Sequence, residues 1–586
     1  MSPRVKNKIT ELIPYLLITV AALCMLWPQI HSRAFISGLD YYFHMSRTYE
    51  TAMQIKTGHF SYFLSIFSWD HSARIVNALY GPIGGYVSGL ILLLTHSWYR
   101  WEIVVSLITL TLSGSLMYHL GRFWHVNGYI DFIVSILYML SSPISDFVFK
   151  QTFTGLGAAL MPLTVLLASE VLIKKDIEPL KLAFILILII EIHLMTFILS
   201  MTFLIPSLLL GLAVAKRKRK HLFKHLLEAL ILTVILSFNV WGGTLEVLGS
   251  NLHHMIPTYP GRHLGTQDFN TIMNTYPQTP LSQTPSVIGL AVMLLMVLSA
   301  VWWLVNIRHV SYVTDVFMLY GLAYVWASSN WFPWSFVEKH ITAAATIIQF
   351  PKRLLPMGIV LIYLMTGTFV SRKIGDRAIY KTGWSFAVVA LCLVTGWCWR
   401  NNYNYLNFKI NLYNRPSVID WVSMHWRVKN NPVQLRNSLR DSHPNRFLRM
   451  VSKPVPDYLP TSINYRHSDQ YLKLDPYDRI ARLFYHHIPY LWNVSGSGGE
   501  IIILHSRSNH VRTVPFVKYA HTRVMLNQRA IRPKINQLGA MHLPLKRGYN
   551  QLAISYRPNP WFKVGMLISL LTWIGLLFKM FYVKFK

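Results

Sequence analysis

Long apolar runs recur along most of this chain, and short polar loops, several of them strongly basic, separate them. About twenty apolar residues in a helix cross the hydrocarbon core of a bilayer. The pattern therefore predicts a polytopic α-helical membrane protein with about twelve spans. The predicted spans are residues 11–30, 101–120, 129–145, 155–173, 180–193, 194–214, 225–242, 286–305, 311–328, 354–372, 381–398 and 562–581.

The basic loops fix the orientation that we expect. With a cytoplasmic N-terminus, the basic clusters in the short loops fall on the cytoplasmic side, as the positive-inside rule requires. The largest cluster is 216–220. A further apolar stretch, 76–95, would reverse this arrangement if it crossed, and Gly81-Pro82 favours a bent element. We therefore predict a re-entrant or interfacial helix there, with an ordinary thirteenth span as the alternative.

The same topology predicts three parts. Residues 1–399 form a transmembrane domain with outer loops 31–100, 243–285 and 329–353. Residues 400–560 form an extracytoplasmic α/β domain, partly helical near 417–428 and rich in strands after the glycines of 495–499. The alternating stretches 501–504, 514–519 and 551–556 predict a small β-sandwich or jelly-roll-like lobe. Residues 561–586 supply the final span and a basic cytoplasmic tail.

Composition agrees with a membrane protein. Hydrophobic residues make up 53% of the chain and charged residues 14%, against about 25% charged in soluble domains. The formal net charge of +32 in so apolar a chain indicates contact with anionic lipids or polymers, and we expect no nucleic acid partner. Residues 400–560 contain 24 basic and 7 acidic residues. This excess predicts binding of an anionic polymer or of lipid headgroups, and a solvated basic surface is the alternative.

Cysteine usage gives no sign of a disulfide framework. The three cysteines, Cys24, Cys392 and Cys398, all fall in predicted spans. An external domain stapled by disulfides would carry its cysteines outside the membrane. We therefore expect none in the extracytoplasmic domain.

Candidate chemistry gathers just after the first span. Asp40, His44 and Arg47 follow one another at helical spacing on the predicted outer face. Asp40 is a candidate general base. His44 is a second catalytic candidate that could orient Asp40, bind phosphate or join a metal site, and Arg47 can contact phosphate. The structural alternatives are a helix N-cap for Asp40 and an ion pair with Glu50 for Arg47. A divalent metal stays an open alternative, although an Asp/His pair falls short of the usual three or four ligands.

Two further groups lie at predicted span ends on the outer side. Arg353, with Lys352 and Gln349, is a candidate phosphate-binding group, because arginine forms bidentate bonds to phosphate. Interfacial snorkelling is the alternative for these cations. Glu191 and His193 fall at the middle of the apolar stretch 182–214, where a tight hairpin would bring both to the outer surface.

Several phrases resemble those of one group of proteins. They are Gly38-Leu39-Asp40 with His44 and Arg47, the Tyr80-Gly81-Pro82 turn, the stretch Gln349 to Arg353, and Asp457-Tyr458-Leu459-Pro460. In this order they resemble bacterial YfhO-like, 6-pyruvoyl-tetrahydropterin-synthase-related membrane proteins, which are similar in architecture to GT-C glycosyltransferases. The resemblance runs from about residue 10 to the end and adds Asp457 to the candidates. The acidic residue that the family shows before the fourth span is missing near Thr154.

The resemblance implies a membrane glycosyltransferase. Such an enzyme moves a sugar from a polyprenyl-phosphate donor to a cell-envelope polymer or glycolipid on the outer face of the cell membrane. The alternatives are a non-catalytic envelope-assembly or scaffold protein with the same fold, and a transporter. The sequence shows no internal repeat of the kind common in transporters.

Overall fold

The computed structural model describes residues 3–584 apart from 39, 152, 252–254, 256–289, 330, 342–347, 373–380, 415–424, 430, 464–475, 486–489 and 496–497. Most of the predicted outer loop 243–285, and most of the helix predicted near 417–428, lie outside the described residues. His425–Trp426 of that predicted helix form a short strand instead.

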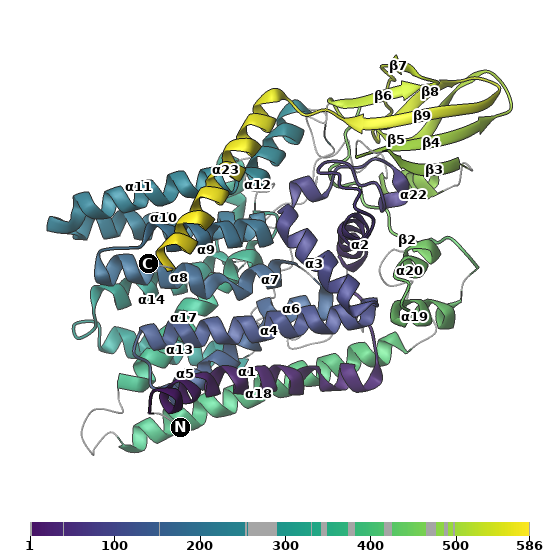
Figure 1. Ribbon diagram of the computed structural model, residues 1–586. Helices are drawn as coiled ribbons and strands as arrows, with labels where there is room; N and C mark the ends of the chain where they lie inside the picture. The colour runs from purple at the N-terminus through teal and green to yellow at the C-terminus, as the bar shows by residue number, and fades with distance from the viewer. Residues whose placement is uncertain are drawn as a thin grey trace.

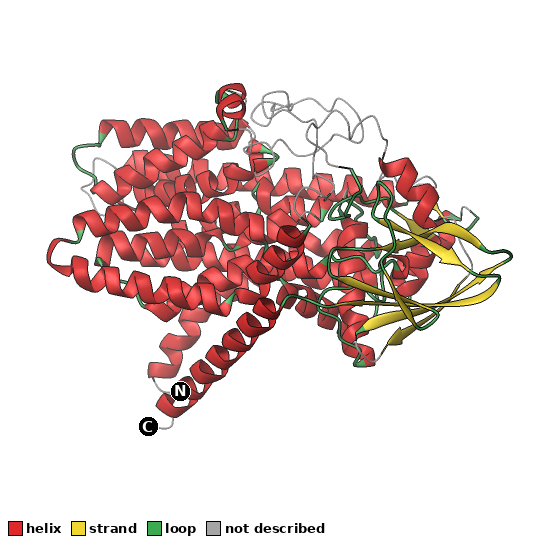
Figure 2. Cartoon of the chain, turned by 90° about the horizontal axis from the view of Figure 1, so that it is seen from above, coloured by secondary structure: helices red, strands yellow, loops and turns green. Residues whose placement is uncertain are grey.

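A helical bundle makes up the larger part of the molecule, and a β-rich lobe stands at one end of it (Figures 1 and 2). The bundle helices are α1 Pro3–Ser32, α4 Trp98–Phe123, α5 Gly128–Met139, α6 Ser142–Lys150, α7 Phe153–Ala159, α8 Met161–Lys174, α9 Pro179–Ile192, α10 Leu194–Val214, α11 Arg219–Leu236, α12 Phe238–Thr244, α13 Leu290–Val305, α14 Tyr312–Ala327, α15 Trp334–His340, α17 Leu355–Arg372, α18 Lys381–Tyr413 and α23 Pro560–Lys584. Two shorter helices, α2 Tyr41–Thr57 and α3 Pro82–Thr95, lie between the bundle and the lobe.

We call the end that carries α2, α3 and the strands the lobe end. The opposite end, where the 175–178 and 215–218 turns lie, is the loop end. Both chain termini lie toward the loop end (Figures 1 and 2). The side chain of Lys218 reaches the carbonyl oxygen of Lys174 at 3.5 Å, which joins the two turns.

Six helical segments among the described residues are long and apolar enough to cross a membrane, and the number rises to eight if each of two bent pairs is one span. The bent pairs are α5 with α6, at 43°, and the α11 segment with α12, at 62°. The chain thus has the helices of a membrane protein. Each of the twelve predicted apolar runs falls on a helix or a bent pair, although several of these helices are short of a full crossing.

The 76–95 stretch forms a short helix at the lobe end. Helix α3 has 14 residues and begins at Pro82, whose missing N–H costs nothing in the first turn. It packs against α2 and not along the length of the bundle (Figure 1). This arrangement agrees with the predicted interfacial helix.

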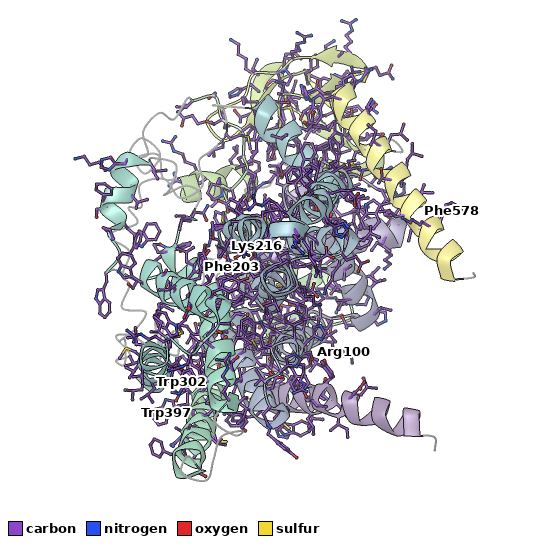
Figure 3. All side chains as sticks on the ribbon, turned by 90° about the vertical axis from the view of Figure 1, so that its left-hand side faces the viewer. Arg100, Phe203, Lys216, Trp302, Trp397 and Phe578 are labelled. Carbon is purple, nitrogen blue, oxygen red and sulfur yellow. The ribbon has the colours of Figure 1, made fainter. Side chains whose placement is uncertain are left out.

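Burial separates central from peripheral helices. Of the most apolar stretch in the segment that contains α17, 89% is buried inside the protein, whereas in α23 the share is only 11%. Close approach at the centre depends on glycine, since a Cβ on Gly358 would lie 3.1 Å from the Gly321 carbonyl oxygen of α14. Viewed from the loop end, Phe203 lies inside the bundle, and Trp397 and Phe578 project from its periphery (Figure 3). Exposed apolar side chains around the bundle are typical of a lipid-facing surface.

The described part of the lobe contains short helices, a small antiparallel pair of strands, β1 with β2, and two larger antiparallel sheets. Five strands pair in the order β3-β4-β9-β6-β7, and β5 pairs with β8. Inward side chains of both sheets, among them Ile502, Leu552 and Phe516, share one apolar core. The predicted strand stretches fall in or overlap β4, β5 and β9. The elements are α19 Pro432–Arg440, α20 Asn445–Met450, α22 Pro476–Tyr485, β1 His425–Trp426, β2 Val451–Ser452, β3 Tyr490–Ser495, β4 Gly499–Ser506, β5 His510–Val517, β6 Thr522–Leu526, β7 Arg529–Ile531, β8 Ala540–Leu545 and β9 Gly548–Tyr556.

One buried carboxylate anchors the lobe to the bundle. Glu246, at the end of α12, receives hydrogen bonds from the Asn559 backbone N–H at 3.1 Å and from the Asn559 side chain at 3.2 Å. It also lies 2.7 Å from His521 Nδ1 and accepts from Tyr556 at 3.3 Å. Since a buried charge needs such partners, Glu246 holds the base of the lobe in a fixed position. This fixes how lobe residues meet the lobe end of the bundle.

Candidate functional site

The segment that leads to Asp40 is held by the bundle beneath it. The Ile36 N–H donates to the buried Glu102 carboxylate at 2.9 Å, and the Gln151 side chain donates to the Ile36 carbonyl at 3.0 Å. The Lys409 ammonium donates to the Ser37 carbonyl at 2.8 Å. Hydrogen bonds from three helical regions therefore fix the backbone before Asp40.

Gly38 explains why the Gly-Leu-Asp phrase begins with glycine. A Cβ at this position would lie 1.8 Å from the Lys150 carbonyl oxygen, so only glycine lets the chain pass the end of α6. The Lys150 side chain pairs with Asp146 at 2.9 Å. The phrase thus brings Asp40 close to the charged end of α6.

Asp40 heads helix α2 without capping it. The residue occupies the N-cap position, but its side chain makes no capping hydrogen bond, and it is exposed to solvent. The surrounding protein still displaces enough water to raise the pKa of the carboxyl, and the charges of Lys453, Arg353 and Lys352 lower it in part. We use the word recess for the surroundings of Asp40, which is exposed to water although nearby protein atoms raise the pKa of its carboxyl.

The charged groups of this recess come from segments far apart in the chain. Lys453 and Asp457 belong to the lobe, Arg353 and Lys352 to the turn before α17, and Asp40 to the segment after α1. We call these five residues the Asp40 recess. Desolvation and, to a smaller extent, the Asp40 charge raise the pKa of Asp457 to about 6, against the lowering effect of the Arg74 and Lys453 charges. The two carboxylates therefore disfavour each other's ionised form.

Two cations of the recess, Lys352 and Arg353, lie on a tight turn. Gln349 adopts a left-handed φ of 59°, and its side-chain oxygen accepts from the Arg353 guanidinium at 2.8 Å. A 3₁₀ turn, Pro351–Leu354, then leads into α17. Lys352 is exposed, and Arg353 is partly exposed. Gln349 thus orients Arg353, while both cations stay open to solvent.

His44 and Arg47 lie deeper than Asp40, although they share its helix. Both are 5% exposed. The His44 ring stacks on Phe153 at 3.8 Å. The Arg47 guanidinium donates to the Asn77 side chain and the Tyr80 carbonyl, each at 3.0 Å. Arg47 therefore braces the 77–80 turn and does not pair with Glu50.

Glu50 has a different set of partners. Its carboxylate accepts the backbone N–H groups of Ile66, Phe67 and Ser68 at 2.8–2.9 Å. It also accepts from the Gln54 side chain at 2.8 Å. Glu50 thus shapes the first long loop from within.

Burial of the His44 ring has an electrostatic consequence. Desolvation first, and then the nearby Arg47 and His193 charges, lower the pKa of His44 well below its ordinary value. The imidazole is therefore neutral at physiological pH and cannot act as a cationic phosphate ligand there. Its contacts make it part of the packing under the Asp40 recess.

Glu191 and His193 flank a tight reversal, as the hairpin interpretation predicts. His193 alone separates α9 from α10, and its Nδ1 accepts the Thr196 N–H at 3.1 Å as an N-cap. The Glu191 carboxylate accepts the Ile83 N–H of α3 at 3.1 Å and the side-chain amide of Asn239. These contacts secure α3 and α10.

Sequence reasoning missed three charged residues that bear on the recess. Lys453 precedes the Asp457 phrase in an extended Lys-Pro-Val-Pro stretch. Arg74 donates to the Asp457 carbonyl at 2.7 Å. Asp146, which lies outside the position expected for a family carboxylate, is among the charges that act on Lys352. In the sequence, Lys453 stands four residues before Asp457, with Pro454 and Pro456 between them. This spacing could have indicated that Lys453 accompanies Asp457.

Among the described residues, one group of three side chains could hold a metal ion, and it lies away from the Asp40 recess. Asp176, His221 and His225 place their ligand atoms within 4.8 Å of one another, at the loop end. His225 Nδ1 lies 2.9 Å from the Asp176 carboxylate. This cluster is separate from the Asp40 recess.

The recess combines two chemical capacities. Its exposed carboxylate can accept a proton, and its cations can bind an anionic oxygen. No known family model and no curated protein matches the chain. The resemblance to YfhO-like proteins therefore rests on the sequence phrases alone.

Proposed function

We propose that this protein is a GT-C-like, YfhO-like membrane glycosyltransferase. It transfers a sugar from a polyprenyl-phosphate donor to a cell-envelope polymer or glycolipid acceptor. In this proposal the lobe end faces the outside of the cell membrane, and the N-terminus is cytoplasmic.

One observation carries the proposal. The three phrases that resemble the family, around Asp40, Arg353 and Asp457, are separated by about a hundred residues or more in sequence, yet Arg353 and Asp457 each interact electrostatically with Asp40. A purely structural role would not require Asp40 and Lys352 to stay exposed to solvent. A carboxylate beside cations at the end of apolar helices suits a lipid-linked phosphate substrate.

The chemistry assigns a role to each group. The Asp40 carboxylate takes the proton of the acceptor hydroxyl, whose oxygen bonds to the anomeric carbon of the donor sugar. The bond between that carbon and the phosphate oxygen breaks, and the phosphate keeps the electron pair. Arg353, oriented by Gln349, and the point charge of Lys352 stabilise the departing phosphate. Lys453 and Asp457 set the charge around Asp40.

Donor binding tests the role of Arg353. Arg353→Ala should weaken binding of a radiolabelled polyprenyl-phosphate hexose to the purified protein on the order of a hundredfold, because charge-assisted bidentate bonds are lost. The affinity of Arg353→Lys should lie between those of wild type and Arg353→Ala, since lysine keeps the positive charge but cannot form bidentate hydrogen bonds. Arg100→Gln, which changes an exposed arginine outside the recess, is the control. Equal affinity of Arg353→Ala and wild type would remove this role.

Turnover tests the activity itself. Purified protein in lipid vesicles, supplied with washed cell envelopes as acceptor, should consume at least one donor from a panel of polyprenyl-phosphate sugars. Consumption of none of them would favour the alternative of a non-catalytic envelope-assembly protein.

A further inference from the structure

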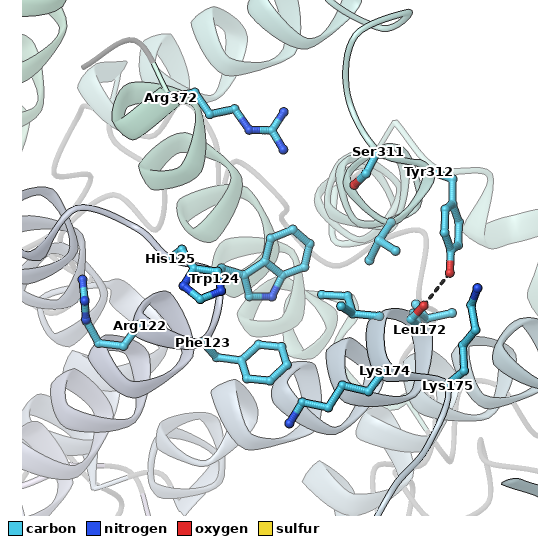
Figure 4. Close-up of a pocket in the computed structure, with 12 residues that line it drawn as sticks. Arg122, Phe123, Trp124, His125, Leu172, Lys174, Lys175, Ser311, Tyr312 and Arg372 are labelled. Carbon is cyan, nitrogen blue, oxygen red and sulfur yellow. Dashed lines mark hydrogen bonds between the residues drawn. The ribbon is translucent and has the colours of Figure 1, made fainter. Parts of the chain in front are cut away.

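A cavity of about 630 Å³ lies at the loop end, remote from the Asp40 recess. It is bounded by the C-terminal ends of α4, α8 and α17 and by the start of α14 (Figure 4). A second, smaller cavity of about 220 Å³ shares Trp124, His125 and Arg372 with it. Arg372 therefore lines both cavities.

Cationic side chains dominate the polar part of the main cavity. Arg122, Lys174, Lys175 and Arg372 line it, and no carboxylate belongs to its lining among the described residues. Arg372 lies on one side of the cavity, and Lys174 and Lys175 lie on the other (Figure 4). Cations on opposite sides can contact one anionic group between them.

The positive charge of the lining is only partly neutralised. Lys174 pairs with Glu170 at 2.9 Å, but Glu170 is shared with Lys181 at the same distance. The Arg122 guanidinium donates to the Val126 carbonyl and interacts electrostatically with the Asp131 side chain, whereas Lys175 and Arg372 have no ion pair among the described residues. The cavity therefore keeps an excess of positive charge.

The remaining wall is apolar and aromatic. Phe123 and Ile173 supply accessible apolar surface, and Ile173 is 48% exposed, whereas Leu172 and Val313 are buried. Tyr312 is fixed by a hydrogen bond from its hydroxyl to the Leu172 carbonyl (Figure 4). A small inorganic anion would leave this apolar wall unused, whereas a lipid would cover it with the first part of its acyl chains.

The position of the cavity suits a lipid headgroup. The three helices that end there, α4, α8 and α17, belong to segments long enough to cross a membrane, so their ends fall at the headgroup level. Tryptophan and tyrosine, here Trp124 and Tyr312, are enriched at that level. Basic pockets between helix ends are typical binding sites for anionic lipid headgroups.

We propose that this cavity binds one anionic phospholipid, with its phosphate between Arg372 and Lys175 and its proximal acyl chains along Phe123 and Ile173. The site is separate from the proposed transferase site and does not depend on that activity. It gives the loop end a fixed lipid contact that a zwitterionic lipid satisfies less well.

Native mass spectrometry of the detergent-purified full chain can test the proposal with phosphatidylglycerol and phosphatidylcholine of identical chains. Wild type should retain phosphatidylglycerol preferentially. The double variant Lys175→Gln/Arg372→Gln should reduce that affinity on the order of tenfold, because two cations near the headgroup are removed. Lys220→Gln, which removes an exposed lysine outside the cavity lining, should leave it unchanged.

Three results would overturn the proposal. The first is equal retention of both lipids by wild type, and the second is an unchanged preference in the double variant. The third is displacement of the bound lipid by millimolar inorganic phosphate, which would identify a small-anion site. The melting temperature of each variant in zwitterionic detergent shows whether a loss of binding reflects a loss of folding.

Discussion

Asp40 and Arg47 lie two turns apart at the start of the same helix, and their surroundings are opposite. Asp40 is exposed, makes no capping hydrogen bond and faces cations from two other segments. Arg47 is 5% exposed and donates to Asn77 and Tyr80. Residues of one motif can thus have different roles. The exposed Asp40 is available for chemistry, whereas the buried and hydrogen-bonded Arg47 stabilises the fold.

The largest effect that this comparison predicts is on turnover. Asp40→Asn should lower the rate of sugar transfer about 10²–10⁴-fold, the usual contribution of a general base. The melting temperature should barely change, since asparagine is as good at an N-cap position as aspartate. Asp441→Asn, which removes a surface carboxylate paired with Arg446, is the control for turnover. Wild-type turnover in Asp40→Asn would remove Asp40 from catalysis.

The opposite variant should act on stability. Arg47→Met keeps the length of the side chain but loses two hydrogen bonds from a charged donor, and about 3 kcal/mol of folding free energy with them. Thermal unfolding in detergent should show a clear fall in melting temperature, against no change in Arg100→Met. A variant as stable as wild type would contradict the bracing role that separates Arg47 from Asp40.

A smaller effect concerns the pH dependence of transfer. Asp457 and Asp40 disfavour each other's ionised form, so Asp457→Asn should lower the pKa of Asp40. The base form of Asp40 would then persist to lower pH, and the acidic limb of the pH–rate profile should move down by a fraction of a unit. A limb that moves up, or stays in place, would show that the two carboxylates are not coupled.

Much of the fold was predictable, because apolar runs and alternating strands are local signals. The helices of the bundle and the strands β4 and β9 follow from them directly. The sequence did not predict that Asp40 lies near Lys453 and Asp457, since this depends on the position in which the hydrogen bonds of Glu246 hold the lobe against the bundle. The depth of His44 was also hidden, because helical spacing gives a shared face but does not reveal that Phe153 covers the ring.

The pH–rate profile of Lys453→Gln tests the central claim most directly. The account holds that Asp40 acts as an ionised base, with its raised pKa lowered in part by the Lys453 charge. Loss of that charge should raise the pKa of Asp40 further, so the acidic limb should move to higher pH while the rate at alkaline pH is largely kept. An unmoved limb, or one displaced to lower pH, would contradict the role of Asp40 as the base.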